Sequence, residues 1–147
     1  MSQPGPIPWV PGAIRQLLLA DAPFMTECGS RVSSRLPSTV TFCARVRLAG
    51  NNSLSGDGVA WSPLVQVEGW CAPGVTGVSD PEVKAWDIAA RAAVVIGRSR
   101  NITYQNMTYS VRLVEGPLSD VDTSRGESTP LYWSLVRAEL NAHVTAT

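Results

Sequence analysis

Several residue types are scarce in this chain, and each shortage argues against a class of protein. Charged residues make up only 16% of the sequence and cancel to a formal net charge of zero. The chain therefore lacks the excess of basic residues that would indicate binding to nucleic acid or to an anionic membrane surface. The single histidine, His143, has no serine or cysteine at a catalytic motif spacing. The sequence therefore predicts a protein that is not an enzyme.

Cysteine is also rare, and its spacing does not suit a metal or a disulfide framework. Cys28, Cys43 and Cys71 are odd in number and include no C-x-x-C pair. We expect them to be small buried hydrophobic residues with free thiols, as in a reducing cytoplasm. Asp120 and Asp122 form a D-x-D pair without the further ligands of a calcium loop. The prediction is therefore no metal and no cofactor.

Long apolar runs are missing as well. The longest, from Ala89 to Gly97, is interrupted by Arg91 and is far shorter than a membrane span, so no membrane association is expected. The chain does have 44% hydrophobic residues in 147, enough for one globular domain, which we place at residues 11–147. Five tryptophans are many for this length, and large aromatic residues favour interfaces as well as cores.

Residues 1–10 form a segment of a different kind, with prolines at positions 4, 6 and 8. Proline has no backbone N–H and fixes φ, so this stretch predicts an extended arm rather than a helix or a central strand. The arm carries Ile7 and Trp9, and we predict that these side chains lie across an adjacent subunit.

The first half of the domain predicts short helices followed by strands. A helix opens at Pro11 and a second helical turn covers residues 21–29. Residues 39–48 alternate as a strand, which places Arg45 and Arg47 on the face opposite Val40, Phe42, Ala44, Val46 and Leu48. A turn-rich loop follows at residues 49–58, and then a second strand at residues 64–71.

The best-defined element is a helix over residues 81–98. Ser79 with Glu82 has the spacing of a capping box, and Asp80 before Pro81 is an alternative cap. An apolar stripe at helical spacing predicts the buried face as Val83, Trp86, Ala90, Ala93, Val94 and Gly97.

The last third predicts more strands. Residues 102–113 alternate with a change of register at Gln105, which indicates a hairpin turn or bulge. Residues 116–130 predict a polar loop, which contains Asp120, Asp122, Arg125 and Glu127, and residues 131–144 predict a final strand. This order predicts an α+β fold, a mostly antiparallel sheet flanked on one face by helices.

The charges, although balanced, are unevenly distributed along the chain. Residues 1–56 carry five arginines against two acids, a balance of +3, and residues 101–147 carry three arginines against five acids, a balance of −2. Unlike patches can meet in head-to-tail contacts between copies of one chain. A random scatter of charges on a solvated surface explains the same distribution equally well. All but one of the basic residues are arginine, which favours planar, bidentate pairing at interfaces.

The order of these features resembles a known family. A helix IRQLLLADAPF is followed by GSRVSSRLP, a strand, LVQVEGWCAP, the capped helix DPEVKAWDIAARAAVVIG, a strand, a long loop and LYWSLVRAELNAHV. This order is similar to that of the tail-terminator, or tail-completion, proteins of long-tailed non-contractile bacteriophages, in the form found in phages of actinobacteria. The resemblance extends from about Val10 to Val144.

The resemblance implies a structural protein of the virion, made in the host cytoplasm. It would form a homohexameric ring on the last ring of the tail tube, stop tube growth and join the tail to the connector or stopper proteins of the head. A chain of this length has a radius of gyration of about 15 Å, and hence a diameter of about 38 Å. Six such subunits touching in a ring leave a central hole that is also about 38 Å across. DNA would pass through this lumen without specific binding.

Two alternatives remain open at this stage. One is a neighbouring role in the same particle, as a connector stopper or a tail-tube subunit. The other is a small binding domain or enzyme with a cleft around Trp61, Trp70 and His143.

Overall fold

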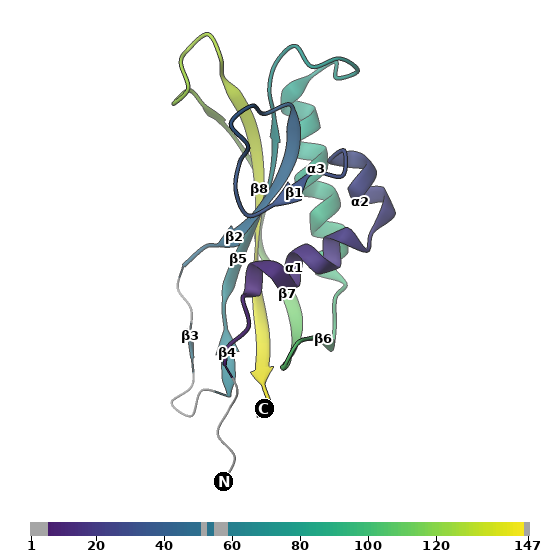
Figure 1. Ribbon diagram of the computed structural model, residues 1–147, viewed down its shortest axis with the longest axis vertical. Coiled ribbons are helices and arrows are strands. Elements are labelled where there is room, and N and C mark those ends of the chain that lie inside the picture. The colour runs from purple at the N-terminus through teal and green to yellow at the C-terminus, as the bar shows by residue number, and fades with distance from the viewer. Residues whose placement is uncertain (1–5, 51–52, 55–58, 146–147) are drawn as a thin grey trace.

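Long antiparallel strands form the frame of the molecule, with helices packed against them (Figure 1). The computed structural model describes residues 6–50, 53–54 and 59–145. Its helices are α1 (Val10–Leu19), α2 (Ala22–Glu27) and α3 (Pro81–Gly97). Its strands are β1 (Val32–Ser33), β2 (Phe42–Leu48), β3 (Ser53–Leu54), β4 (Ala60–Ser62), β5 (Leu64–Cys71), β6 (Ile102–Tyr104), β7 (Met107–Asp122) and β8 (Leu131–Val144).

All of these strands join one sheet, in which β5 and β8 are central. The order is β1-β2-β5-β8-β4-β3, with β7 along the other side of β8 and β6 beside β7. Among the described strands, only the β1–β2 pairing is parallel. Strand β5 pairs with β2 from Val65 to Cys71 and with β8 from Glu139 to Tyr132. The predicted α+β class with a mostly antiparallel sheet is confirmed.

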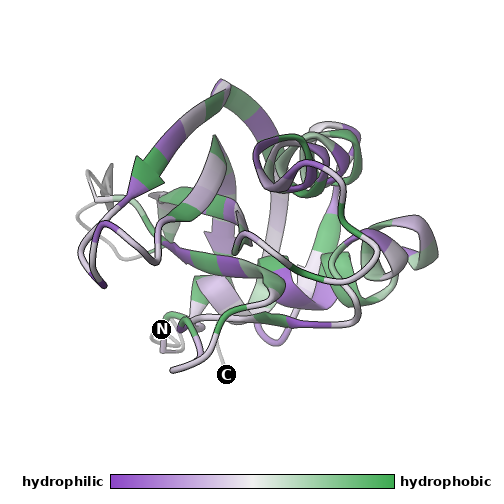
Figure 2. Cartoon of the chain, turned by 90° about the horizontal axis from the view of Figure 1, so that it is seen from above, coloured by the Kyte–Doolittle hydropathy of each residue, from purple (hydrophilic) through white to green (hydrophobic). Residues whose placement is uncertain are grey.

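The three helices gather on one side of the sheet, as the view from above shows (Figure 2). Alternate residues of β2, β5, β7 and β8 face the helices and form the main core with Ile14 and Leu18 of α1 and Ile88 and Ile96 of α3.

The N-termini of α2 and α3 are capped by side chains that lie next to them in the sequence. Asp21 accepts a hydrogen bond from the Phe24 amide at the start of α2. At α3 the cap is Asp80, the alternative to Ser79, and its carboxylate accepts from the amides of Glu82 and Val83.

The predicted buried face of α3 is wrong for its large side chains, although Ala93 does pack against the core. The residues that pack on the sheet are Ala85, Ile88, Ala89, Ala92, Val95 and Ile96, whereas Val83, Trp86 and Val94 of the predicted stripe are exposed. Close packing of helix on sheet selects the alanine-rich face, because a Cβ added at Gly69 of β5 would lie 2.3 Å from the Ala85 carbonyl oxygen. The helix therefore has two apolar faces, one buried and one exposed.

The predicted loop over residues 116–130 is largely wrong as well. Strand β7 continues to Asp122 and pairs with β8 as far as Leu131, so only residues 123–130 connect the two strands. Gly116 and Pro117 interrupt the pairing with a bulge, between Glu115 and Leu118, rather than ending the strand. The resulting β7–β8 hairpin extends to the top of Figure 1.

Smaller differences concern element ends and faces. Helix α1 begins at Val10, inside the predicted arm, because the Val10 side chain is buried in the main core. Val40 precedes β2 and packs on the opposite side of the sheet from Ala44 and Val46. Part of the predicted 49–58 loop lies outside the described residues, and residues 53–54 pair with β4. The hairpin turn at Gln105 is confirmed.

Candidate assembly surfaces

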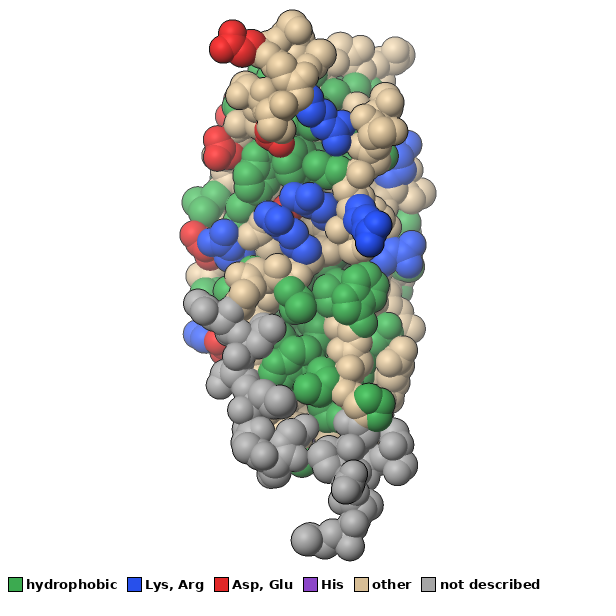
Figure 3. Space-filling model, turned by 60° about the vertical axis from the view of Figure 1, so that its left-hand side comes forward, with side chains coloured by type: hydrophobic (Ala, Val, Ile, Leu, Met, Phe, Trp, Pro, Cys, Tyr) green, Lys and Arg blue, Asp and Glu red, His purple; other side chains and the backbone are tan. Residues whose placement is uncertain are grey.

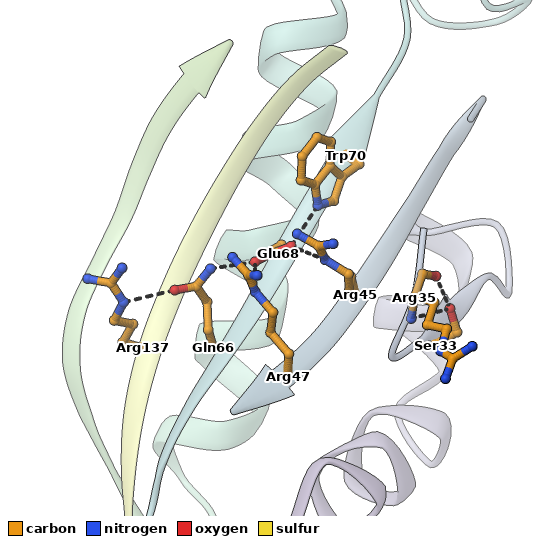
Figure 4. A network of polar contacts seen from close by, with 8 residues as sticks. All are labelled: Ser33, Arg35, Arg45, Arg47, Gln66, Glu68, Trp70 and Arg137. Atoms are coloured by element: carbon orange, nitrogen blue, oxygen red, sulfur yellow. Dashed lines mark hydrogen bonds and ion pairs between the residues drawn. The ribbon is translucent and has the colours of Figure 1, made fainter. Parts of the chain in front are cut away.

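The face of the sheet that carries no helix holds a buried carboxylate. Gln66, Glu68 and Trp70 alternate along β5 and point to this face, and Glu68 has no exposed side-chain surface. Its carboxylate accepts hydrogen bonds from Arg45 Nε at 2.5 Å, Arg47 Nε at 2.8 Å and Trp70 Nε1 at 2.9 Å, and from the Gln66 amide (Figure 4). A buried charge requires this density of donors, because water cannot solvate it.

The register of the sheet brings these partners together. Arg45 and Arg47 of β2 lie directly across from Glu68 and Gln66 of β5, and Arg137 of β8 lies across from Gln66 on the other side. Arg137 Nε donates to Gln66 Oε1 at 2.8 Å, and its other end pairs with Glu115 at 2.5 Å. A continuous polar chain therefore crosses four strands, β2, β5, β8 and β7.

Arginines form a band across the middle of this face, with apolar side chains above and below it (Figure 3). Most of their charge is balanced within the chain. Glu68 pairs with Arg45 and Arg47, Glu115 with Arg137, and Glu139 with Arg112. These four arginines and three carboxylates together carry a net charge of only +1.

Stacked tryptophans occupy the upper part of the same face. The rings of Trp70 and Trp133 lie 5.1 Å apart and nearly parallel, and the Arg45 guanidinium lies 5.2 Å from the Trp70 ring centroid. Val40, Cys43 and Leu131 complete this second, smaller cluster of buried residues. The cluster anchors the base of the β7–β8 hairpin to β2 and β5.

The tip of the hairpin is held by contacts within the chain. Arg125 donates from its two terminal nitrogens to the carbonyl oxygens of Ser38 and Pro37, at 2.9 and 3.1 Å. Hydrogen bonds from the amide and then the hydroxyl of Ser124 lower the pKa of the Asp122 carboxyl. Glu127 is exposed in the connection. Arg125, predicted as an interface residue, therefore also docks the hairpin on its own domain.

The described part of the N-terminal arm lies at the other end of β7. The Asn106 side chain, in the turn before β7, donates to the Pro6 carbonyl oxygen at 2.9 Å. Ile7 and Trp9 are both exposed. Since β7 runs for 16 residues, this end lies roughly 50 Å from the hairpin tip.

The predicted interface residues therefore do not form one site. The structure brings Arg45 and Arg47 together on the helix-free face, places Asp120, Asp122, Arg125 and Glu127 on the hairpin, and leaves Ile7 and Trp9 at the far end. Their roles as contacts between subunits remain predictions. Sequence reasoning missed Glu68, although an acid that alternates with Gln66 and Trp70 opposite two arginines was a signal for it.

The predicted cleft around Trp61, Trp70 and His143 is wrong. Trp61 pairs across from Ala142 and packs in the main core on the helix side, whereas Trp70 belongs to the cluster on the opposite face. His143 is exposed near the end of β8. The sheet itself therefore separates Trp61 from Trp70.

The three cysteines are buried and free, as predicted. Burial raises the pKa of the Cys43 thiol to about 11, and it also raises the pKa values of Cys28 and Cys71. At a pKa of about 11, roughly one Cys43 thiol in a thousand is ionised at pH 8, and only the thiolate is a good nucleophile.

We therefore expect the native protein to resist alkylation at all three thiols. With iodoacetamide at pH 8, mass spectrometry should find the native chain essentially unlabelled after the time in which the urea-unfolded chain gains three adducts. Rapid labelling of the native chain would contradict the buried positions.

Among the described residues, no group of three or more His, Cys, Asp or Glu side chains is placed to hold a metal ion. No helix within that part of the chain is long and apolar enough to cross a membrane.

Comparison with solved structures gives an informative similarity of fold. No family model matches the chain, and no curated protein matches its sequence. The fold is similar to that of a chain in the structure titled "Virion of native gene transfer agent (GTA) particle", with a TM-score of 0.59. The two chains are 13% identical, and the match covers 90% of this chain and 94% of the other. The similarity thus establishes a shared fold over almost the whole length of both chains.

Proposed function

We propose that this chain is a structural protein of a phage-like virion. The observation that carries the proposal is the shared fold with a chain of a virion particle, which leaves little of either chain unmatched. A subunit of that kind acts through its contacts with other proteins. Its own surface supports such a role, because the exposed apolar residues on α3 and β7 have no place in the core of a monomer.

Within the virion, we propose the role of tail terminator. The protein would form a homohexameric ring at the head-proximal end of the tail, bind the last ring of tail-tube protein and present its other side to the head connector or stopper protein. The support is the order of elements along the chain, from the N-terminal helix to the final strand, which resembles that of tail terminators. A connector stopper and a tail-tube subunit remain the alternative roles.

The chemistry of the molecule supports a structural role without catalysis. The buried cysteines have raised pKa values, which disfavour nucleophilic thiolates. The arginine band is largely neutralised by Glu68, Glu115 and Glu139. If this face lines the lumen, DNA would pass without being held by its phosphates, because tight binding needs many unpaired cations.

Electron microscopy of the purified chain tests the proposal. A terminator should form single rings that do not stack, and adding it to polymerising tail-tube protein should yield shorter tubes with one closed end. Long tubes formed by this chain alone would instead identify a tube subunit. Rings that bind connector protein but leave tube length unchanged would identify a stopper.

A further inference from the structure

Helix α3 presents an apolar face to the outside of the molecule. Val83, Trp86 and Val94 are 52%, 42% and 49% exposed, and they lie at helical spacing on the face opposite the one that packs on the sheet. The exposed side of a helix that covers a sheet is normally polar. An apolar stripe in that place therefore marks a surface that another molecule covers.

The stripe continues onto the neighbouring strand β7. Trp86 and Ser119 line the same hollow, and a Cβ added at Gly97 of α3 would lie 3.0 Å from Leu113. Leu113, Val114 and Val121 of β7 are themselves exposed. From Arg112 to Asp122 the outer edge of β7 pairs with no other strand in the described part of the chain. We call this combined area the α3–β7 surface.

The size of the surface shows why β7 must belong to it. A stripe along a helix of 17 residues measures about 26 Å by about 10 Å, or roughly 260 Å². A stable, specific interface buries about 800 Å² on each partner. The stripe of α3 alone is therefore too small, whereas the stripe together with the free half of β7 approaches the required area.

A complementary hollow lies at the opposite edge of the sheet. Beside β1, a groove of about 430 Å³ is lined by Val32, Leu36, Pro37 and Cys43, with Arg31 and Arg35 along it. We call it the β1 groove. Strands β2, β5 and β8 separate β1 from β7, so the groove and the α3–β7 surface lie on opposite sides of the molecule.

The unpaired charges of the two surfaces are opposite on balance, since two acids outnumber Arg91 on the exposed side of α3. Glu82 and Asp87 flank Trp86, and neither forms an ion pair with another described residue. Arg35 is exposed and likewise has no acidic partner within that part of the chain. Acids beside an apolar stripe and arginines beside an apolar groove are complementary, and opposite charges at the rim of an interface fix its register.

We propose that the α3–β7 surface of one copy docks into the β1 groove of the next copy. The inference rests on the ring of the proposed function and assigns the two surfaces that build it. Because the surfaces differ and lie on opposite edges of the sheet, the contact is head-to-tail. Each docked copy leaves one surface free for a further copy, and the chain of contacts closes into a ring.

Trp86→Glu tests the first surface. The change places a charge at the centre of the α3–β7 surface, and light scattering after size-exclusion chromatography should find monomers where the wild type gives rings. Leu19→Glu is the matched control, since Leu19 is also 42% exposed but lies on α1, outside both surfaces. Circular dichroism should show both variants folded.

The outcomes separate this inference from the proposed function. Rings of Trp86→Glu as stable as those of the wild type would overturn the docking surface and leave the terminator role standing. A wild type that stays monomeric at high concentration would overturn both.

Mixing two variants tests the direction of the contact. Arg35→Glu alters the β1 groove and should raise the concentration needed for ring assembly at least tenfold. At a concentration where both variants alone are monomeric, a mixture of Trp86→Glu and Arg35→Glu keeps one intact surface on each chain. The mixture should therefore form heterodimers and nothing larger. A mixture that stays monomeric would overturn the pairing of these two surfaces.

Discussion

Replacing Glu68 with alanine is expected to destabilise the fold by about 3–5 kcal/mol. The Glu68 side chain is fully buried and accepts hydrogen bonds from Arg45, Arg47, Gln66 and Trp70. Its removal leaves the partly buried Arg45, which is 19% exposed, without its carboxylate and beside a second arginine. The lost pairing, the unpaired donors and the repulsion between the two guanidinium groups all act in the same direction. Urea unfolding followed by tryptophan fluorescence measures the change in the free energy of unfolding.

A surface carboxylate provides the matched control for this experiment. Glu139 of β8 pairs with Arg112 of the neighbouring strand β7 at 3.2 Å, but both side chains are exposed. Solvent screens such a pair, so Glu139→Ala should cost less than about 1 kcal/mol. Equal costs for the two alanine variants would show that the buried network contributes nothing beyond an ordinary surface ion pair.

Gly69→Ala is expected to destabilise the fold about as much as Glu68→Ala, for a steric reason. The new Cβ would lie 2.3 Å from the Ala85 carbonyl oxygen and 2.7 Å from the Ile88 Cβ, so α3 would have to move away from β5. Overpacking of a core usually costs about 1–3 kcal/mol. Here the clash is with backbone rather than with a flexible side chain, and we expect a loss of about 3 kcal/mol or more in thermal or urea unfolding.

The same substitution at Gly97 should behave differently. Its added Cβ meets only the end of the Leu113 side chain, at 3.0 Å, and alanine favours a helix over glycine by about 1 kcal/mol. Gly97→Ala should therefore change the free energy of unfolding by less than about 1 kcal/mol. If Gly69→Ala were equally mild, the close packing of α3 on β5 would be wrong.

Elements with a strong local signal could be predicted from the sequence. The strand β5 begins at Leu64, directly after Pro63, and its ends agree with the predicted ones. The final strand β8 also has the predicted bounds, because its alternation of apolar and polar residues is long and regular. The helix α3 follows from the Asp-Pro cap and the run of alanines.

The buried face of α3 could not be read from periodicity, because the helix carries apolar residues on both sides. Val83, Trp86 and Val94 form a stripe as regular as that of Ala85, Ile88 and Ala92. The packing against Gly69 decides between them, since the missing side chain at Gly69 lets the Ala85 carbonyl and the Ile88 side chain lie directly against β5. The choice also determines which surface remains for a partner.

The length of the β7–β8 hairpin could not be predicted from the sequence, for a related reason. Taken alone, Gly116 and Pro117 are signals of a turn. Residues 118–122 nevertheless pair with β8 and extend the hydrogen-bonded ladder of β7. Pairing with a strand that follows later in the chain outweighs the local preference for a turn, and the glycine and proline are accommodated in a bulge.

The sequence by itself determined the balance of charge, the α+β class, the bounds of β5 and β8 and the position of the capped helix α3. These features depend on residues close together in the chain, through backbone dihedral preferences and the period of the side chains. Only the tertiary structure decided which arginines share Glu68, which face of α3 is exposed and which surfaces lie on opposite edges of the sheet. Those outcomes depend on contacts between segments far apart in sequence, such as β5 with β8, which the packing of the whole domain selects.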